Sequence, residues 1–158
     1  MTPARRYAPA GAFAKSFRRP SREGEVRRLL LICLGGALGT GARYLIASWV
    51  GQRYGAGFPR GTVLINVAGS FLIALIMEVS LTTGAVPEHL RLFLTTGVMG
   101  GFTTYSSFNH ETLTLSRAGA WSLASLNLVL TVAGCLVAGV LGILAARGIA
   151  RLGAGLGS

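Results

Sequence analysis

The sequence predicts an all-α integral membrane protein with four transmembrane helices, and three observations lead to this fold class. Of the 158 residues, 51% are hydrophobic and only 13% are charged, against about 25% charged in a typical soluble domain. The apolar residues gather in four stretches close to the ~20 residues that a membrane-spanning helix needs. These stretches are residues 29–50, 62–81, 90–108 and 121–146. None of them alternates with the two-residue period of a half-buried strand.

Both ends of the chain differ in composition from the apolar middle. Residues 1–28 hold more than half of the 15 Lys and Arg residues, mixed with Pro, Ala, Gly and Ser, which predicts a basic disordered tail. Residues 148–158 are expected to form a Gly-rich C-terminal tail, which leaves a four-helix membrane domain at 29–147. The basic tail lacks the folded, aromatic-lined face of a nucleic-acid binder. We therefore expect no nucleic-acid partner, and a lipid-facing tail on a multi-pass protein of the cell inner (plasma) membrane.

The first stretch, 29–50, contains one charge, Arg43, which follows a Gly-rich segment. Gly35 and Gly39 form a GxxxG motif, which allows another helix to approach closely. Arg43 is near enough to the end of the stretch to extend to the membrane interface as an anchor. Alternatively, it forms a positive vestibule that concentrates anions.

The second stretch carries Asn66 among apolar residues. Its amide group has two donor hydrogens and one acceptor oxygen. A hydrogen bond to another helix is the usual role of such a residue in a membrane bundle. Gly69 and Ser70 follow it and would let a neighbouring backbone come close.

The third stretch has poor helix-forming residues at its centre. Gly100 and Gly101 weaken a helix, and four nearby hydroxyl groups compete with helical hydrogen bonds. These hydroxyls belong to Thr103, Thr104, Ser106 and Ser107. We expect the helix to break within residues 100–104, which would free carbonyls and amides that protein, water or an ion must satisfy.

Two aromatic residues follow this expected break. Tyr105 and Phe108 are three residues apart and share one helix face, with Ser107 between them in sequence. Rings at this spacing usually serve ordinary packing. Their place beside a broken, hydroxyl-rich segment makes a binding role a second hypothesis.

The fourth stretch has no charge and carries one polar stripe. Asn127, Thr131 and Cys135 recur at four-residue intervals and so lie on one helix face. The stripe forms either interhelical hydrogen bonds or a track of donors. Cys33 and Cys135 lack CxxC spacing, so we expect two buried small hydrophobic residues rather than a disulfide or metal ligands.

The connecting segments are short, which predicts that consecutive spans are antiparallel neighbours. From residue 29 onward, three Arg residues would lie on each side of the membrane, so this part of the chain could insert in either direction. The basic N-terminal tail favours a cytoplasmic N-terminus.

The sequence does not carry the motifs of an enzyme. It contains no HExxH or CxxC motif and no converging Ser, His and Asp. A small multidrug-type exporter is an alternative, but it would need a carboxylate deep in the membrane. Glu78 and Glu111 lie near span ends and are interpreted as interfacial charges. A structural membrane subunit without transport is a third hypothesis.

Three segments closely resemble the fluoride channel (Fluc/CrcB) family. They are GGALGTGARY at 35–44, GTVLINVAGSF at 61–71 and GGFTTYSSF at 100–108. The resemblance extends over residues 29–146, and it implies a fluoride-selective channel that passively exports fluoride from the cytoplasm and so reduces fluoride toxicity. It also implies an antiparallel, dual-topology homodimer with two pores. The unusual basic tail leaves open a heterodimer with an oppositely oriented paralogue.

The resemblance also implies roles for particular residues. The backbone carbonyls of Gly100 and Thr103 would hold a structural sodium ion at the dimer centre. The implied pore residues are Arg43, Asn66, Tyr105, Ser107, Phe108, Thr131 and Cys135. Among them Asn66 would donate to fluoride, and the two aromatic rings would present their edges to it. The family usually has Phe at the position of Tyr105 and a hydroxyl at that of Cys135, whose thiol is a weaker donor.

Overall fold

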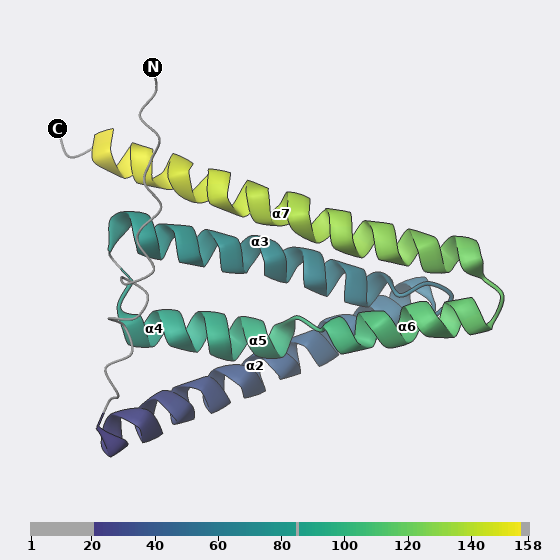
Figure 1. The fold of residues 1–158 in the computed structure, drawn as a ribbon, viewed down its shortest axis with the longest axis horizontal. Coiled ribbons are helices and arrows are strands. Elements are labelled where there is room, and N and C mark those ends of the chain that lie inside the picture. The colour runs from purple at the N-terminus through teal and green to yellow at the C-terminus, as the bar shows by residue number, and fades with distance from the viewer. Residues whose placement is uncertain (1–20, 85, 156–158) are drawn as a thin grey trace.

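The computed structural model describes residues 21–84 and 86–155, which form four helical rods lying side by side (Figure 1). The first two rods are α2 (Arg22–Tyr54) and α3 (Arg60–Thr83). The third rod consists of α4 (Glu88–Leu92), a π-helix η2 (Phe93–Met99), α5 (Gly100–Phe102) and α6 (Tyr105–Arg117). The fourth rod is α7 (Trp121–Gly155). The predicted all-α class and the four-rod arrangement are confirmed.

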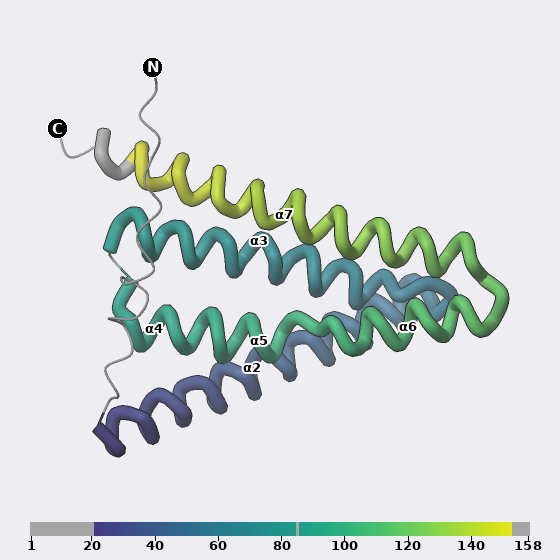
Figure 2. The backbone as a smooth tube through the Cα atoms, in the orientation of Figure 1, coloured from purple at the N-terminus to yellow at the C-terminus, as the bar shows by residue number. Residues whose placement is uncertain are grey.

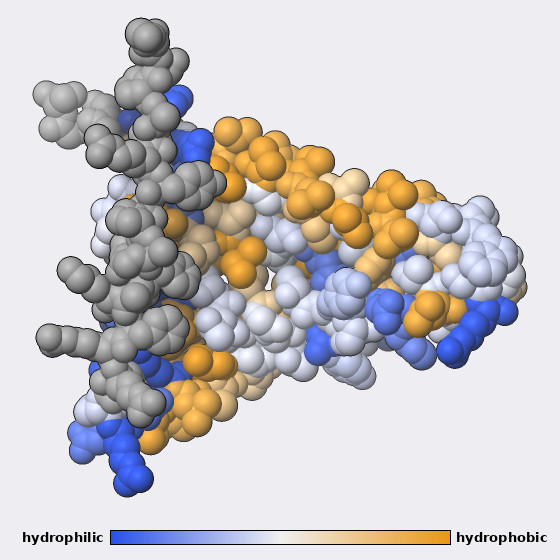
Figure 3. Space-filling model, viewed as in Figure 1, coloured by the Kyte–Doolittle hydropathy of each residue, from blue (hydrophilic) through white to orange (hydrophobic). Residues whose placement is uncertain are grey.

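The surface of these rods is that of a membrane protein. Within the described part of the chain, α2, α3 and α7 are each long and apolar enough to cross a membrane. Leu34, Leu45 and Leu136 are more than 60% exposed. Apolar atoms run along the rods, and strongly polar atoms gather mainly toward their ends (Figure 3). Such extensive apolar exposure is foreign to a soluble monomer, so the chain is a multi-pass membrane protein.

Two helices are longer than the sequence indicated. The first begins at Arg22 because the Ser21 hydroxyl accepts a hydrogen bond from the Gly24 amide at 3.4 Å, and two Glu residues in the first turn favour the positive helix end. Residues 22–28 are therefore helix and not tail. At the other end α7 runs to Gly155, past the expected boundary at 147, since isolated glycines do not stop a helix. The remainder of both predicted tails lies outside the described residues.

The first and third rods approach each other through glycines. A Cβ atom on Gly35 would lie 2.7 Å from the Phe93 carbonyl oxygen, and one on Gly97 would lie 3.0 Å from the Gly35 Cα. A Cβ on Gly39 would overlap the Val98 carbonyl oxygen. The expected close approach at the GxxxG motif is thus confirmed, and its partner is the third rod.

The third rod breaks where the sequence predicted (Figure 2). Thr103 and Thr104 are extended, with φ/ψ of −78°/154° and −151°/108°. The rod then resumes as α6 and continues to Arg117, beyond the expected end at residue 108. The π-helical turns of η2 just before the break were not anticipated.

The cysteines are less buried than expected. Cys33 is exposed on α2, and Cys135 is half-buried on α7. The expectation of two buried residues is wrong for Cys33, because this part of α2 contacts the third rod through its glycine face and leaves the remaining faces open.

Candidate functional site

A hollow of about 470 Å³ opens beside the break, and we call it the break hollow. Its lining residues are Asn66, Ser70, Ile73, Thr103, Thr104, Tyr105, Phe108, Thr131, Val132, Cys135 and Leu136. They come from α3, the third rod and α7. Five of the seven pore residues implied by the sequence therefore meet at one place, and Arg43 and Ser107 are the two that do not line it.

Asn66 joins α3 to the break by two hydrogen bonds. Its Oδ1 accepts from the Thr104 amide at 2.8 Å, and its Nδ2 donates to the Thr104 carbonyl at 3.0 Å. The side chain is only 7% exposed. Because Nδ2 carries two hydrogens, one donor remains for another partner in the break hollow.

Ser107 belongs to the cap of α6. The Thr104 hydroxyl accepts from the Ser107 amide at 3.2 Å and donates to the Ser107 hydroxyl at 3.0 Å. This is the usual role of Thr at a helix N-cap. The cap places the positive end of α6 at the edge of the break hollow.

Tyr105 and Phe108 lie on the same face of α6 but in different surroundings. Phe108 is buried, with 4% exposure, whereas Tyr105 is 77% exposed. Their ring centroids are 5.6 Å apart and the ring planes are inclined by 61°. The two rings form an edge-to-face pair at the wall of the hollow, with Tyr105 on its outer side.

The polar stripe of α7 divides into two parts. Asn127 is fully buried and donates to the Thr112 hydroxyl of α6 at 2.8 Å. Thr131 and Cys135 line the break hollow instead. The interhelical hydrogen bond is thus made by Asn127, and the Thr131 hydroxyl donates to Asn127 Oδ1 at 3.5 Å.

Arg43 points toward the third rod and bonds its backbone. Its Nε donates to the Gly101 carbonyl at 3.1 Å, and the side chain is half-buried. The Thr40 hydroxyl donates to the same carbonyl over a longer 3.4 Å. The guanidinium is thus engaged by a carbonyl that the helix break has released.

The helix break frees the carbonyls of Gly100 and Thr103, which the resemblance implies as sodium ligands. The Thr104 amide, which would bond Gly100 in an unbroken helix, donates to Asn66. The Ser107 amide, which would bond Thr103, donates to the Thr104 hydroxyl. Both carbonyls thus lose their helical donors, and carbonyl oxygens of this kind suit a hard cation. The donor set fits sodium.

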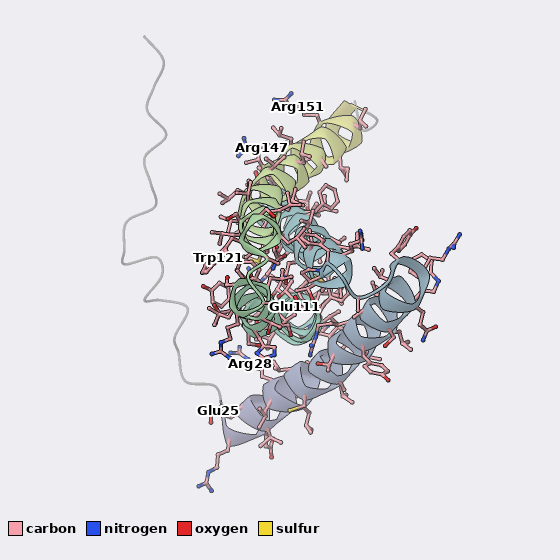
Figure 4. All side chains as sticks on the ribbon, turned by 90° about the vertical axis from the view of Figure 1, so that its right-hand side faces the viewer. Glu25, Arg28, Glu111, Trp121, Arg147 and Arg151 are labelled. Carbon is pink, nitrogen blue, oxygen red and sulfur yellow. The ribbon has the colours of Figure 1, made fainter. Side chains whose placement is uncertain are left out.

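Glu78 and Glu111, the acidic residues near the span ends, have ion-pair or hydrogen-bond partners. Glu78 accepts from Arg147 Nε at 2.8 Å, which links α3 to α7. Glu111 lies among the packed helices (Figure 4), where its Oε1 accepts from the Thr62 hydroxyl at 2.7 Å. Its Oε2 is buried and has no hydrogen-bond partner in the described part of the chain. Glu111 is thus held against α3 by its hydrogen bond to Thr62, a contact between α6 and α3 that no sequence signal marks.

Comparison with known proteins decides the family. Residues 30–143 match the family described as CrcB-like protein, Camphor Resistance (CrcB). The chain belongs to this family. A "Fluoride-specific ion channel FluC" from Anaeromyxobacter sp. (strain K) is 59% identical over 123 residues, covering 78% of this chain and 98% of the relative. The protein of the same name from Sorangium cellulosum (strain So ce56) is 52% identical over 122 residues, covering 77% of this chain and 96% of the relative.

The family match confirms the resemblance drawn from the three sequence segments. The alignments cover 98% and 96% of the length of these two relatives. The aligned part of this chain is therefore about as long as each relative. Residues 1–28 lie before the matched region.

Proposed function

We propose that this CrcB-family chain is a fluoride-selective ion channel and not an enzyme, and that it exports fluoride passively from the cytoplasm. The observation that carries the proposal is the break hollow, which brings Asn66 together with an aromatic pair and the polar residues of α7. A relative that is 59% identical carries the name of a fluoride-specific channel. Fluoride enters cells as a neutral weak acid and is held there as the anion, so a passive path suffices for its removal.

The break hollow offers the donors that a small, strongly hydrated anion needs. Asn66 has a spare amide hydrogen and Cys135 adds a thiol. The Thr131 hydroxyl also lines the hollow and could turn to it from its long 3.5 Å bond to Asn127. Tyr105 and Phe108 present the positive edges of their rings. Ser107 contributes through the cap that aims the positive end of α6 at the hollow.

Arg43 adds a positive charge on the α2 side of the break. In a low-dielectric interior such a charge raises the local concentration of anions. We place it in the vestibule of the path, as the resemblance implies.

We further propose that the third rod also crosses the membrane and that two antiparallel copies form the channel. The break hollow is open on one side, where Tyr105 is 77% exposed, and a second copy would close it. Gly100 is exposed, with no atom within 4 Å of its Cβ position. Two copies meeting there would bring four carbonyls, from Gly100 and Thr103 of each, around one sodium ion. The ion would supply a fixed positive charge that offsets repulsion between anions.

Anion efflux from liposomes tests the proposed function. Purified protein is reconstituted, and fluoride and chloride release are followed with ion-selective electrodes. We expect rapid fluoride release and chloride release that is lower by orders of magnitude. Equal rates for the two halides, or absence of fluoride release, would contradict the proposal.

A further inference from the structure

We propose that Arg43 is a positioning residue that holds the helix break in place through the Gly101 carbonyl, with Thr40 as a weaker second donor. This inference rests on the proposed function, because its effect is measured on fluoride selectivity. It gives Arg43 a task in addition to attracting anions. It concerns a hydrogen bond between α2 and the third rod that each single chain makes by itself.

The bond replaces one that the break removes. In an unbroken helix the Gly101 carbonyl would accept from the Tyr105 amide. The extended conformation of Thr103 and Thr104 carries that amide away. Arg43 Nε then donates to the Gly101 carbonyl at 3.1 Å. A bond from a charged donor is stronger than one from a neutral donor, so it favours the broken conformation over the continuous helix.

The two donors reach the carbonyl because the backbones nearly touch. Thr40 and Arg43 are three residues apart on α2 and so share a face. A Cβ on Gly101 would overlap the Gly36 carbonyl oxygen and lie 3.0 Å from the Thr40 hydroxyl. With no room for the rods to shift closer, the position of the Gly101 carbonyl is fixed by α2.

The other side of the break is held by a different rod. Asn66 of α3 bonds both the amide and the carbonyl of Thr104. The break is therefore held from α2 before Thr103 and from α3 after it. Tyr105 and Phe108 follow directly, so their place in the break hollow depends on both attachments.

Two neutral variants separate this role from anion attraction. In Arg43→Gln the side-chain nitrogen occupies the position of Arg Nε along the chain, so the donor remains while the charge is lost. In Arg43→Met both the charge and the donor are lost. Each variant is reconstituted for fluoride and chloride efflux, and hydrogen exchange by mass spectrometry follows the amides of residues 101–106. Arg53→Gln and Arg53→Met, on an exposed part of α2, are the matched controls.

The positioning role predicts different outcomes for the two variants. Arg43→Gln is expected to keep the wild-type fluoride-to-chloride ratio and wild-type exchange, with a flux loss that shrinks as salt is added. Arg43→Met is expected to lower the ratio about tenfold or more and to speed exchange at 101–106. A mere loss of folded protein would lower flux without changing the ratio. Both Arg53 variants are expected to match the wild type.

Equal selectivity and equal exchange in Arg43→Gln and Arg43→Met would overturn the inference. Should Arg43→Met not be recovered as folded protein, Arg43→Leu, which also lacks charge and donor, takes its place beside Arg43→Gln. Faster exchange at 101–106 in Arg43→Leu than in Arg43→Gln supports the positioning role, and equal exchange overturns it. If the wild-type protein conducts no fluoride, the proposed function fails, but the exchange comparison still decides the role of Arg43.

Discussion

Phe108 is the buried member of the aromatic pair, and its ring is the side chain of the break hollow that is easiest to test. It is 4% exposed, and its ring meets that of Tyr105 at an edge-to-face angle. We predict that Phe108→Ile lowers fluoride efflux at least tenfold, which corresponds to about 1.4 kcal/mol, because Ile fills similar space without a positive ring edge. Efflux from liposomes checks this, and gel filtration shows whether assembly is preserved. Wild-type efflux from a well-folded variant would rule out a role for the ring edge.

Asn66 has a structural role and a proposed conducting role. Replacing its amide by a carboxylate keeps part of the structural role but opposes the conducting role. Asn66→Asp still accepts from the Thr104 amide but cannot donate to the Thr104 carbonyl or to an anion. We predict loss of fluoride efflux, since a negative charge repels the anion. Asn109→Asp, an exposed change of equal charge on α6, is the control and is expected to conduct normally. Conduction by Asn66→Asp would mean that Asn66 is structural only.

At the scale of elements, the contact between α2 and the third rod depends on glycine. A Cβ on Gly39 would overlap a backbone oxygen of Val98, which cannot rotate away. We predict that Gly39→Ala lowers stability by about 1–3 kcal/mol, or roughly 2–4 °C in Tm per kcal/mol, measured by thermal unfolding in detergent.

Gly41 provides the matched control for this contact. It lies on the same helix, with no atom within 4 Å of its Cβ position. Gly41→Ala is expected to leave Tm unchanged or to raise it slightly, since Ala favours helix by up to about 1 kcal/mol. An equal drop in Tm for both variants would show that close packing of Gly39 is not the cause.

At the scale of the whole molecule, an antiparallel pair of chains has a geometric consequence. A residue at the middle of the third rod would meet its own copy, whereas a residue near one end would not. We predict that Gly100→Cys forms a cross-linked dimer in a background lacking Cys33 and Cys135, and that Gly148→Cys does not. Both sites have space for a side chain. Denaturing gels after oxidation provide the measurement, and efficient cross-linking at residue 148 with none at 100 would argue against the arrangement.

The N-terminal extension is expected to be dispensable for conduction. Residues 1–20 precede Ser21, which caps α2 and must be retained. We predict that deletion of residues 1–20 leaves fluoride efflux per folded channel within about twofold of the full chain, a change well below 1 kcal/mol. Loss of efflux with unchanged folding would favour instead a protein whose tail is its active part.

The four apolar helical stretches, the break within residues 100–104 and the polar residues near it follow from the sequence alone, because hydropathy, helix propensity and hydroxyl competition act over a few neighbouring residues. The ends of α2 and α7 were less predictable, since a Ser cap and isolated glycines are weak local signals. Only the tertiary structure decided which side chains take the groups freed at the break. Arg43 of α2 bonds Gly101, Asn66 of α3 bonds Thr104, and Glu111 of α6 bonds Thr62 of α3. Such partners are far apart in sequence and become neighbours only when the glycine faces let the backbones approach.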